Sequence, residues 1–216
     1  MHPLIFIDVE TTGLDPTVHT IIELALIRRD RDGSESVFHT RIKPTEQDLD
    51  VASQTALAIN GYRRAPELWE NAPSHSEALA ELLGFLRGSR YGTWVGHNVL
   101  FDVRFLTELL DRELSPEAAA VVALPWRKID TVQLAAEHLQ PMGLTRFGLD
   151  SIRRWLGWSG KNAHTALVDV AQTRRLFDLL WRLGPLRWLA LRSCRFWNRF
   201  VRRTALPRSP LRPGEL

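Results

Sequence analysis

Cysteine is almost absent from this sequence, and long apolar runs are missing from it. The single cysteine among 216 residues, Cys194, excludes an internal disulfide and a cysteine-based zinc site, and it fits a reducing compartment. No apolar run reaches the roughly 18 residues that a membrane span needs, and the residues after Met1 lack the pattern of a secretion signal. We therefore expect a cytoplasmic protein with no stable membrane association.

An excess of basic charge is missing from most of the chain. The formal net charge is +3, but the segment that starts at Arg182 holds nine arginines and one acid, Glu215. That segment carries +8, which leaves −5 on the first 181 residues. The distribution predicts a mildly acidic body with a basic C-terminal extension, and it argues against one continuous basic surface.

The rest of the composition is that of an ordinary globular protein. Hydrophobic residues make up 44% of the chain and charged residues 25%, and the length suits one domain with a sizeable core. We place this domain at residues 1–181, a basic amphipathic helical extension at 182–206 and a flexible tail at 207–216.

The apolar pattern predicts the order of strands and helices. Strands are expected at residues 4–9, 21–27, 37–42 and 91–96, with a fifth at 129–134 that runs into a helix. Helices are expected at 76–86, 99–110, 149–156 and 166–181. Three consecutive strands followed by alternating strands and helices predict an α/β domain, with a mixed five-stranded sheet flanked by helices.

Two acids stand at the end of the first strand, which is otherwise apolar. With the two-residue period of a strand, the side chains of Asp8 and Glu10 leave the same face. Burying like charges side by side is costly unless a cation compensates them, and the strand contains no lysine or arginine. The alternative is a pair of exposed acids at a frayed strand end.

Two further acids, Asp102 and Asp169, fall on predicted amphipathic helices. Asp102 is followed at helical spacing by Phe105, Leu106 and Leu109, so it lies on or beside a buried stripe. Its alternative role is to complement the helix dipole. Asp169 lies early in the last predicted helix. Four acids in apolar surroundings form an all-oxygen set that suits Mg²⁺ or Mn²⁺.

One histidine completes this set. His164 precedes Asp169 by five residues, about 500° of helix, so the two do not share a helix face. We expect His164 on the loop before the helix, from where it can reach the acids; the alternative is an incidental surface residue. Two divalent ions with a neutral histidine as general base would support in-line displacement at phosphorus. The residues therefore predict a phosphodiester hydrolase.

Three short segments carry these five residues: 6–14 (FIDVETTGL), 97–102 (HNVLFD) and 164–169 (HTALVD). In content, order and spacing they resemble the motifs of the DnaQ-like (DEDDh) 3′→5′ exonucleases. The resemblance covers residues 4–181 and implies a ribonuclease H-like fold. The tyrosine subclass of this family would place a tyrosine where this chain has Thr165, so the spacing from His164 to Asp169 indicates the histidine subclass.

The resemblance also implies a role for each of these residues. Asp8 would bridge two Mg²⁺ ions, for which Mn²⁺ can substitute, and Glu10 and Asp169 would complete the tighter site. Asp102 would act mostly through metal-bound water, and His164 would be the general base.

Substrate-binding residues follow from the same resemblance. The segment from Thr11 to Leu14 would grip the terminal nucleotide, with Leu14 as a wedge against the penultimate base. Phe101 would pack near the terminal sugar, and Asn98 would line the path of the strand. Several family members carry a histidine where this chain has residues 58–62, AINGY, which leaves the choice of sugar open. The implied substrate-binding set is Thr11, Thr12, Gly13, Leu14, His97, Asn98 and Phe101.

We therefore expect an exonuclease that acts on single-stranded 3′ ends, with DNA favoured, either alone or as the proofreading partner of a DNA polymerase. The alternatives are an RNA-directed enzyme similar to an oligoribonuclease and a non-catalytic nucleic-acid-binding module. For the basic extension four roles remain open: packing on the body, phosphate contact, docking to a partner protein and binding to a membrane surface.

Overall fold

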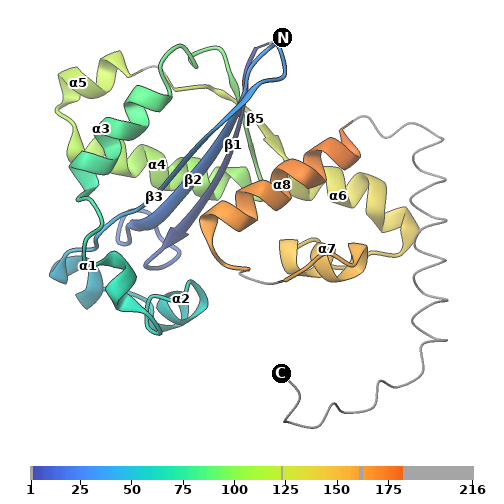
Figure 1. Cartoon of the computed structure of the whole chain (residues 1–216), viewed down its shortest axis with the longest axis horizontal. Helices are drawn as coiled ribbons and strands as arrows, with labels where there is room; N and C mark the ends of the chain where they lie inside the picture. The colour runs from blue at the N-terminus through green and yellow to red at the C-terminus, as the bar shows by residue number, and fades with distance from the viewer. Residues whose placement is uncertain (1, 123, 161–162, 182–216) are drawn as a thin grey trace, which may run out of the picture.

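A five-stranded mixed sheet organises the chain, and its central strand carries the first two acids (Figure 1). The computed structural model describes residues 2–122, 124–160 and 163–181. The strands are ordered β3-β2-β1-β4-β5, with β1 to β3 antiparallel and β4 and β5 parallel to β1. Their bounds are Leu4–Thr11 (β1), Ile21–Arg29 (β2), Glu35–Arg41 (β3), Thr93–Gly96 (β4) and Arg127–Asp130 (β5). The expected mixed α/β sheet is thereby confirmed.

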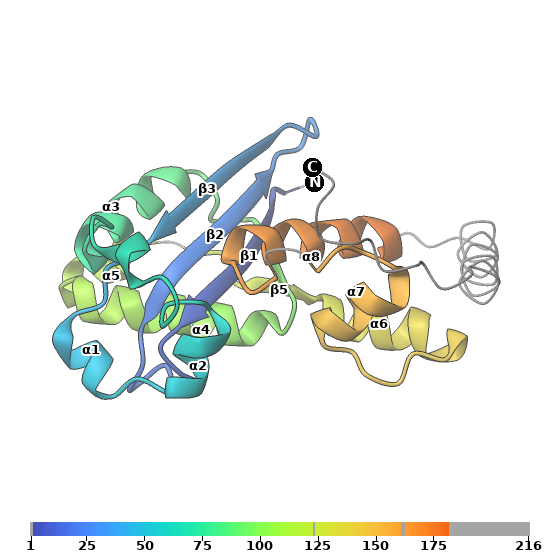
Figure 2. The same ribbon diagram turned by 60° about the horizontal axis from the view of Figure 1, so that its bottom comes forward.

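Helices cover both faces of the sheet (Figure 2). One face is covered by α3 and α4, and the other by α8. The longer helices are α3 (His75–Phe85), α4 (Val99–Glu113), α6 (Thr131–Leu139), α7 (Leu149–Leu156) and α8 (Ala166–Leu180). The short ones are α1 (Glu46–Asp50), α2 (Gln54–Ile59) and α5 (Pro116–Val121), with 3₁₀ turns at η1 (Pro66–Trp69) and η2 (Gln140–Met142).

The side chains of β1 alternate between two cores. Its odd-numbered apolar residues pack against α3 and α4, whereas Phe6 packs against α8, with the Phe6 and Phe177 rings 5.5 Å apart. Asp8 and Glu10 follow Phe6 by two and four residues, so they leave the strand on the face that α8 covers. The alternation of side chains along a largely buried strand thus fixes the direction of both acids.

The fifth strand ends earlier than the sequence predicts. The expected bounds of this strand, 129–134, are wrong, because β5 covers Arg127–Asp130 and α6 begins at Thr131. The side chain of Asp130 accepts a hydrogen bond from the backbone N–H of Val132 at 2.8 Å. This N-cap satisfies a free helix donor and ends the strand at the aspartate.

Three short helices were not expected from the apolar pattern. Thr45, Ser53 and Ser115 cap α1, α2 and α5, each by accepting a hydrogen bond from a backbone N–H of the first turn. These helices have only five or six residues, which is too few to show a helical period.

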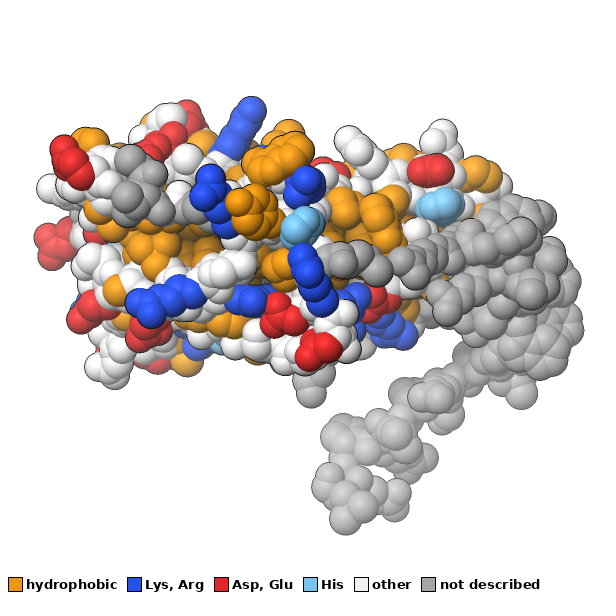
Figure 3. All heavy atoms as spheres, turned by 90° about the horizontal axis from the view of Figure 1, so that it is seen from above, with side chains coloured by type: hydrophobic (Ala, Val, Ile, Leu, Met, Phe, Trp, Pro, Cys, Tyr) orange, Lys and Arg blue, Asp and Glu red, His pale blue; other side chains and the backbone are white. Residues whose placement is uncertain are grey.

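Charge is mixed on the face shown in Figure 3. Arginine and lysine side chains there are interspersed with acidic and apolar ones, without one continuous basic surface. Within the described residues, no helix is long and apolar enough to cross a membrane. The extension at 182–206 and the tail at 207–216 lie outside the described residues, so the boundaries proposed for them stay predictions.

The turn from β4 into α4 is tightly packed around Gly96. A Cβ on Gly96 would lie 2.9 Å from the Cα of Val99, closer than such atoms approach in folded proteins. The carbonyl of Gly96 accepts a hydrogen bond from the hydroxyl of Thr131 at 3.0 Å. The turn is therefore held between α4 and the start of α6.

Gly96→Ala is expected to lower the free energy of unfolding by about 1–3 kcal/mol, because the added methyl meets backbone that cannot rotate away. Gly84→Ala, in α3, adds the same methyl where nothing lies within 4 Å, and it should raise stability by up to about 1 kcal/mol. Urea denaturation of both variants measures the difference. Equal stabilities would contradict close packing at the turn.

Candidate active site

Asp8 and Glu10 lie at the carboxyl end of β1. Their neighbours across the sheet on β2 are Ala25 and Glu23, respectively. The pairing with β2 shifts register between Glu10 and Thr11, so the regular ladder is interrupted directly after the second acid. The strand thus presents both carboxylates at the place where its pairing becomes irregular.

The last helix brings a third acid to the same place. Asp169 lies in the first turn of α8 and is 8% exposed. One carboxylate oxygen from each of Asp8, Glu10 and Asp169 lies within 4.8 Å of the others. The structure therefore brings together three of the four acids that the sequence analysis selects.

The fourth acid, Asp102, approaches from α4. It is 4% exposed, and its Oδ1 accepts a hydrogen bond from the backbone N–H of Val9 at 3.1 Å. Asp102 is not one of the three acids that share the 4.8 Å cluster. Its charge nevertheless acts on Asp8, since repulsion between the two adds to the effect of burial in raising the pKa of Asp8.

Burial raises the pKa of all four carboxyl groups, and repulsion from neighbouring acids raises it further at Asp8, Glu10 and Asp102. Burial, followed by repulsion from Asp169 and Glu23, raises the pKa of Glu10 to about 8. The pKa of Asp8 lies well above its ordinary value, first because of burial and then because of its three acidic neighbours. Burial is also the largest cause of the raised pKa of Asp102 and of Asp169. Without a cation, the site therefore retains protons at neutral pH.

These residues fit a divalent cation. Carboxylate oxygens are the ligands that Mg²⁺ and Mn²⁺ prefer, and the three-acid cluster offers only such oxygens. The pKa values stay raised although Arg153 lies beside the acids, so their negative charge is only partly compensated, as expected for a site that a cation completes. Asp8, Glu10 and Asp169 are the residues that would hold the ion.

His164 lies on the loop before α8, as the sequence predicts. Its backbone is left-handed, with φ 65°, a conformation that few residues other than glycine adopt. Its Nε2 lies 3.3 Å from Oδ2 of Asp150. The histidine side chain is about 42% exposed, so its ring borders the solvent at the edge of the site.

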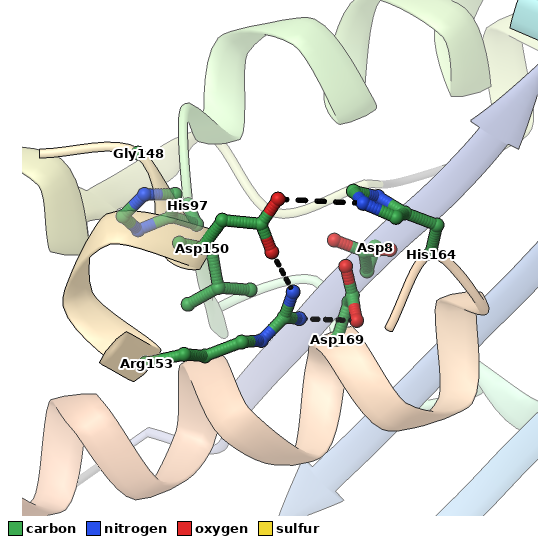
Figure 4. Close-up of a pocket in the computed structure, with 8 residues that line it drawn as sticks. Asp8, His97, Gly148, Asp150, Arg153, His164 and Asp169 are labelled. Carbon is green, nitrogen blue, oxygen red and sulfur yellow. Dashed lines mark hydrogen bonds and ion pairs between the residues drawn. The ribbon is translucent and has the colours of Figure 1, made fainter. Parts of the chain in front are cut away.

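A pocket of about 280 Å³ joins these groups (Figure 4). It takes Asp8 from β1, Asp169 from α8 and His164 from the intervening loop, and α7 with its preceding residue closes one side. The residues on the α7 side, which the sequence analysis missed, are Gly148, Leu149, Asp150 and Arg153.

Arg153 is the most consequential of the missed residues. It is 2% exposed, and its guanidinium donates hydrogen bonds to Asp150, Asp169 and Gln172. Two adjacent arginines in α7 look alike in the sequence, yet Arg153 is buried and Arg154 is exposed. The available signal was the three-residue spacing from Asp150 to Arg153, which suits an ion pair along a helix.

The segment expected to grip the terminal nucleotide forms a constrained turn after β1. The hydroxyl of Thr11 donates to the carbonyl of Gly13 at 2.6 Å, and the hydroxyl of Thr12 accepts from the N–H of Thr20 at 3.0 Å. Leu14 is 81% exposed. This turn lies outside the pocket described above, and its apolar tip faces solvent.

The second motif is braced from α6. His97 lines the pocket and its Nδ1 lies 3.0 Å from the hydroxyl of Thr131; burial lowers the pKa of His97. The backbone N–H of Asn98, which has φ 72°, donates to Oδ1 of Asp130 at 3.0 Å. Phe101 stacks obliquely on Phe105 in α4. Among these three expected substrate residues, only His97 reaches the pocket.

The sequence of the chain is similar to those of known nucleases and of a DNA polymerase. Residues 5–177 match the family RNase_T, described as exonuclease. A DNA polymerase III of PolC type from Thermotoga maritima is 35% identical over 175 residues, which cover 80% of this chain and 11% of the polymerase. Ribonuclease T from Pectobacterium atrosepticum is 27% identical over 184 residues, which cover 80% of this chain and 78% of the ribonuclease.

A solved structure shares the fold. Exonuclease I from E. coli, in complex with a dT13 oligonucleotide, superposes with a TM-score of 0.63 at 21% identity, covering 88% of this chain and 46% of that chain. The present chain thus spans about half of that enzyme and a small part of the polymerase. The match over residues 5–177 shows that the chain belongs to the RNase_T exonuclease family, in agreement with the DnaQ-like motifs of its sequence.

Proposed function

We propose that the chain is a metal-dependent 3′→5′ exonuclease that releases nucleoside 5′-monophosphates from single-stranded nucleic acid, preferably DNA. The observation that carries this proposal is the cluster of Asp8, Glu10 and Asp169, whose ligand atoms lie within 4.8 Å of one another. An exonuclease family member that keeps such a cluster has the means to bind the cations of phosphodiester hydrolysis. A binding module without catalysis would have no need to bury these charges.

The four acids and His164 would each have a separate role in the reaction. Two divalent cations would supply stabilisation of the transition-state charge and activation of water. Asp8, Glu10 and Asp169 would bind these ions, and Asp102 would hold water near them. His164 would accept the proton of the attacking water, since histidine is the side chain whose ordinary pKa lies closest to neutrality.

Substrate binding would use the residues beside the pocket. The exposed Leu14 would wedge against the penultimate base, the turn from Thr11 to Gly13 would hold the last nucleotide, and Phe101 and Asn98 would border the strand. Apolar and aromatic contacts of this kind accept any base. We therefore expect weak sequence preference.

DNA is the substrate we favour, and RNA is the second candidate. The most identical relative named above is a DNA polymerase, and the structural relative holds an oligothymidylate. Ribonuclease T, by contrast, matches over most of its own length, which supports an RNA substrate. The first comparison supports a DNA polymerase as a partner, and a location in the cytoplasm is part of the same proposal.

Digestion of matched, 5′-labelled single-stranded DNA and RNA with Mg²⁺ tests the proposal. We expect ladders that shorten from the 3′ end, faster for DNA, and no digestion in the presence of EDTA. Asp8→Asn should lower kcat by about 10²-fold or more, because it removes a ligand that stabilises charge in the transition state. Internal cleavage, or digestion that EDTA leaves unchanged, would exclude a metal-dependent exonuclease.

The metal-free protein should lose stability as the pH rises from about 4.5 to about 8. In this range folded Glu10, with a pKa of about 8, holds a proton that the unfolded chain releases, since the ordinary pKa is 4.5. The stabilisation is complete below pH 4.5 and lost above about pH 8. Thermal unfolding in EDTA measures this slope, Mg²⁺ should restore stability at pH 8, and Glu10→Gln should flatten the profile. Parallel profiles for the two proteins would contradict the assignment.

A further inference from the structure

A buried arginine borders the carboxylate cluster. Arg153 in α7 is 2% exposed and lines the same pocket as Asp8 and Asp169. Among the described residues that line this pocket, it is the only lysine or arginine. A guanidinium is charged at any physiological pH, so a permanent positive charge lies beside the carboxylates that would hold a metal ion.

Three contacts fix the orientation of this guanidinium. Its Nη2 donates to Oδ1 of Asp169, its Nε donates to Oε1 of Gln172, and its Nη1 donates to Oδ1 of Asp150 at 2.5 Å. Asp169 and Gln172 belong to α8, whereas Asp150 belongs to α7. Arg153 therefore links the two helices and engages every nitrogen of its head group.

The arginine acts on the same negative charge as a metal ion would. Its positive charge opposes the increase in pKa that burial causes at Asp8, Glu10 and Asp169. It also occupies Oδ1 of Asp169, one of the two oxygens that this ligand can offer. Arg153 therefore repels a cation that approaches the cluster. It also holds one oxygen of Asp169 in a hydrogen bond, so this oxygen is not free to bind the cation.

The same arginine is connected to the histidine. Asp150 accepts from Arg153 with Oδ1, and its Oδ2 lies 3.3 Å from Nε2 of His164. Figure 4 shows Asp169, Arg153, Asp150 and His164 in series around the pocket. The position of the histidine ring is thereby coupled to the acid on α8 through three successive contacts: Asp169 with Arg153, Arg153 with Asp150, and Asp150 with His164.

We propose that Arg153 is a positioning residue that competes with the divalent cation for Asp169 and, through Asp150, orients His164. The proposal rests on the metal-dependent function proposed above. Arg153 thus limits the affinity of the site for the metal ion, and it links the metal ligand Asp169 to the general base His164. A purely structural ion pair would stabilise the fold without limiting metal binding.

Binding of Mn²⁺ to the full-length protein, followed by electron paramagnetic resonance without nucleic acid, tests the competition. Arg153→Met should bind Mn²⁺ about tenfold more tightly than the wild type, because a repelling charge and a competitor for Asp169 are both removed. Arg153→Lys, which keeps the charge, should stay near the wild type. Arg154→Met changes the net charge equally at an exposed position of the same helix and should have no effect.

The outcomes separate this inference from the function on which it rests. Unchanged or weaker Mn²⁺ binding by Arg153→Met would overturn the competition while leaving the metal-dependent function intact. A wild-type chain that binds no Mn²⁺ would overturn both. If the methionine variant does not fold, Arg153→Gln tests the loss of the charge alone, since glutamine is uncharged and can still donate to Asp169; it too should bind Mn²⁺ more tightly than the wild type, and unchanged binding would overturn the effect of the charge.

The link to the histidine has its own test. Asp150 is about 51% exposed, so Asp150→Asn should fold normally. We expect kcat on a single-stranded substrate to fall about tenfold with KM within about twofold of wild type, because the base loses its orientation while the nucleic-acid contacts remain. A wild-type kcat, or a loss that appears mainly in KM, would overturn this part of the proposal.

Discussion

Repulsion between buried carboxylates is the constraint on which the rest of this structure depends. One carboxylate oxygen of each of three acids lies within 4.8 Å of the other two. A fourth acid lies close enough to raise the pKa of one of them. Such an arrangement opposes folding, so the surrounding elements must be stable enough to impose it. The largely buried strand β1 and the helices packed on its two faces meet this requirement.

Each of the four acids reaches the site from a helix or a strand. Asp8 and Glu10 are directed by the alternation of β1, Asp169 by the first turn of α8, and Asp102 by its hydrogen bond to the N–H of Val9. The loop residue His164 is different, because it has an uncommon backbone conformation and contacts an exposed aspartate. Acids on helices and strands, with a histidine on a loop, suit the proposed function, in which the acids would hold the ions and the histidine would accept a proton.

The sequence predicted the sheet and the acids because both depend on local regularities. A buried strand interrupted by acids is visible without coordinates, and so is an acid on the apolar stripe of α4. The end of β5 was misjudged because apolar residues continue into α6, and only the cap formed by Asp130 marks the boundary. Arg153 was missed because its burial is set by packing between α7 and α8, which the arginine pair at 153 and 154 does not reveal.

The two ends of the described chain meet in the cluster, since Asp8 belongs to the first strand and Asp169 to the last helix. During synthesis the ribosome releases β1 long before α8 exists. A growing chain therefore lacks one acid of the cluster until α8 docks on the sheet. The proposed exonuclease activity would then arise only after α8 is in place, so incomplete chains would not hydrolyse nearby nucleic acid.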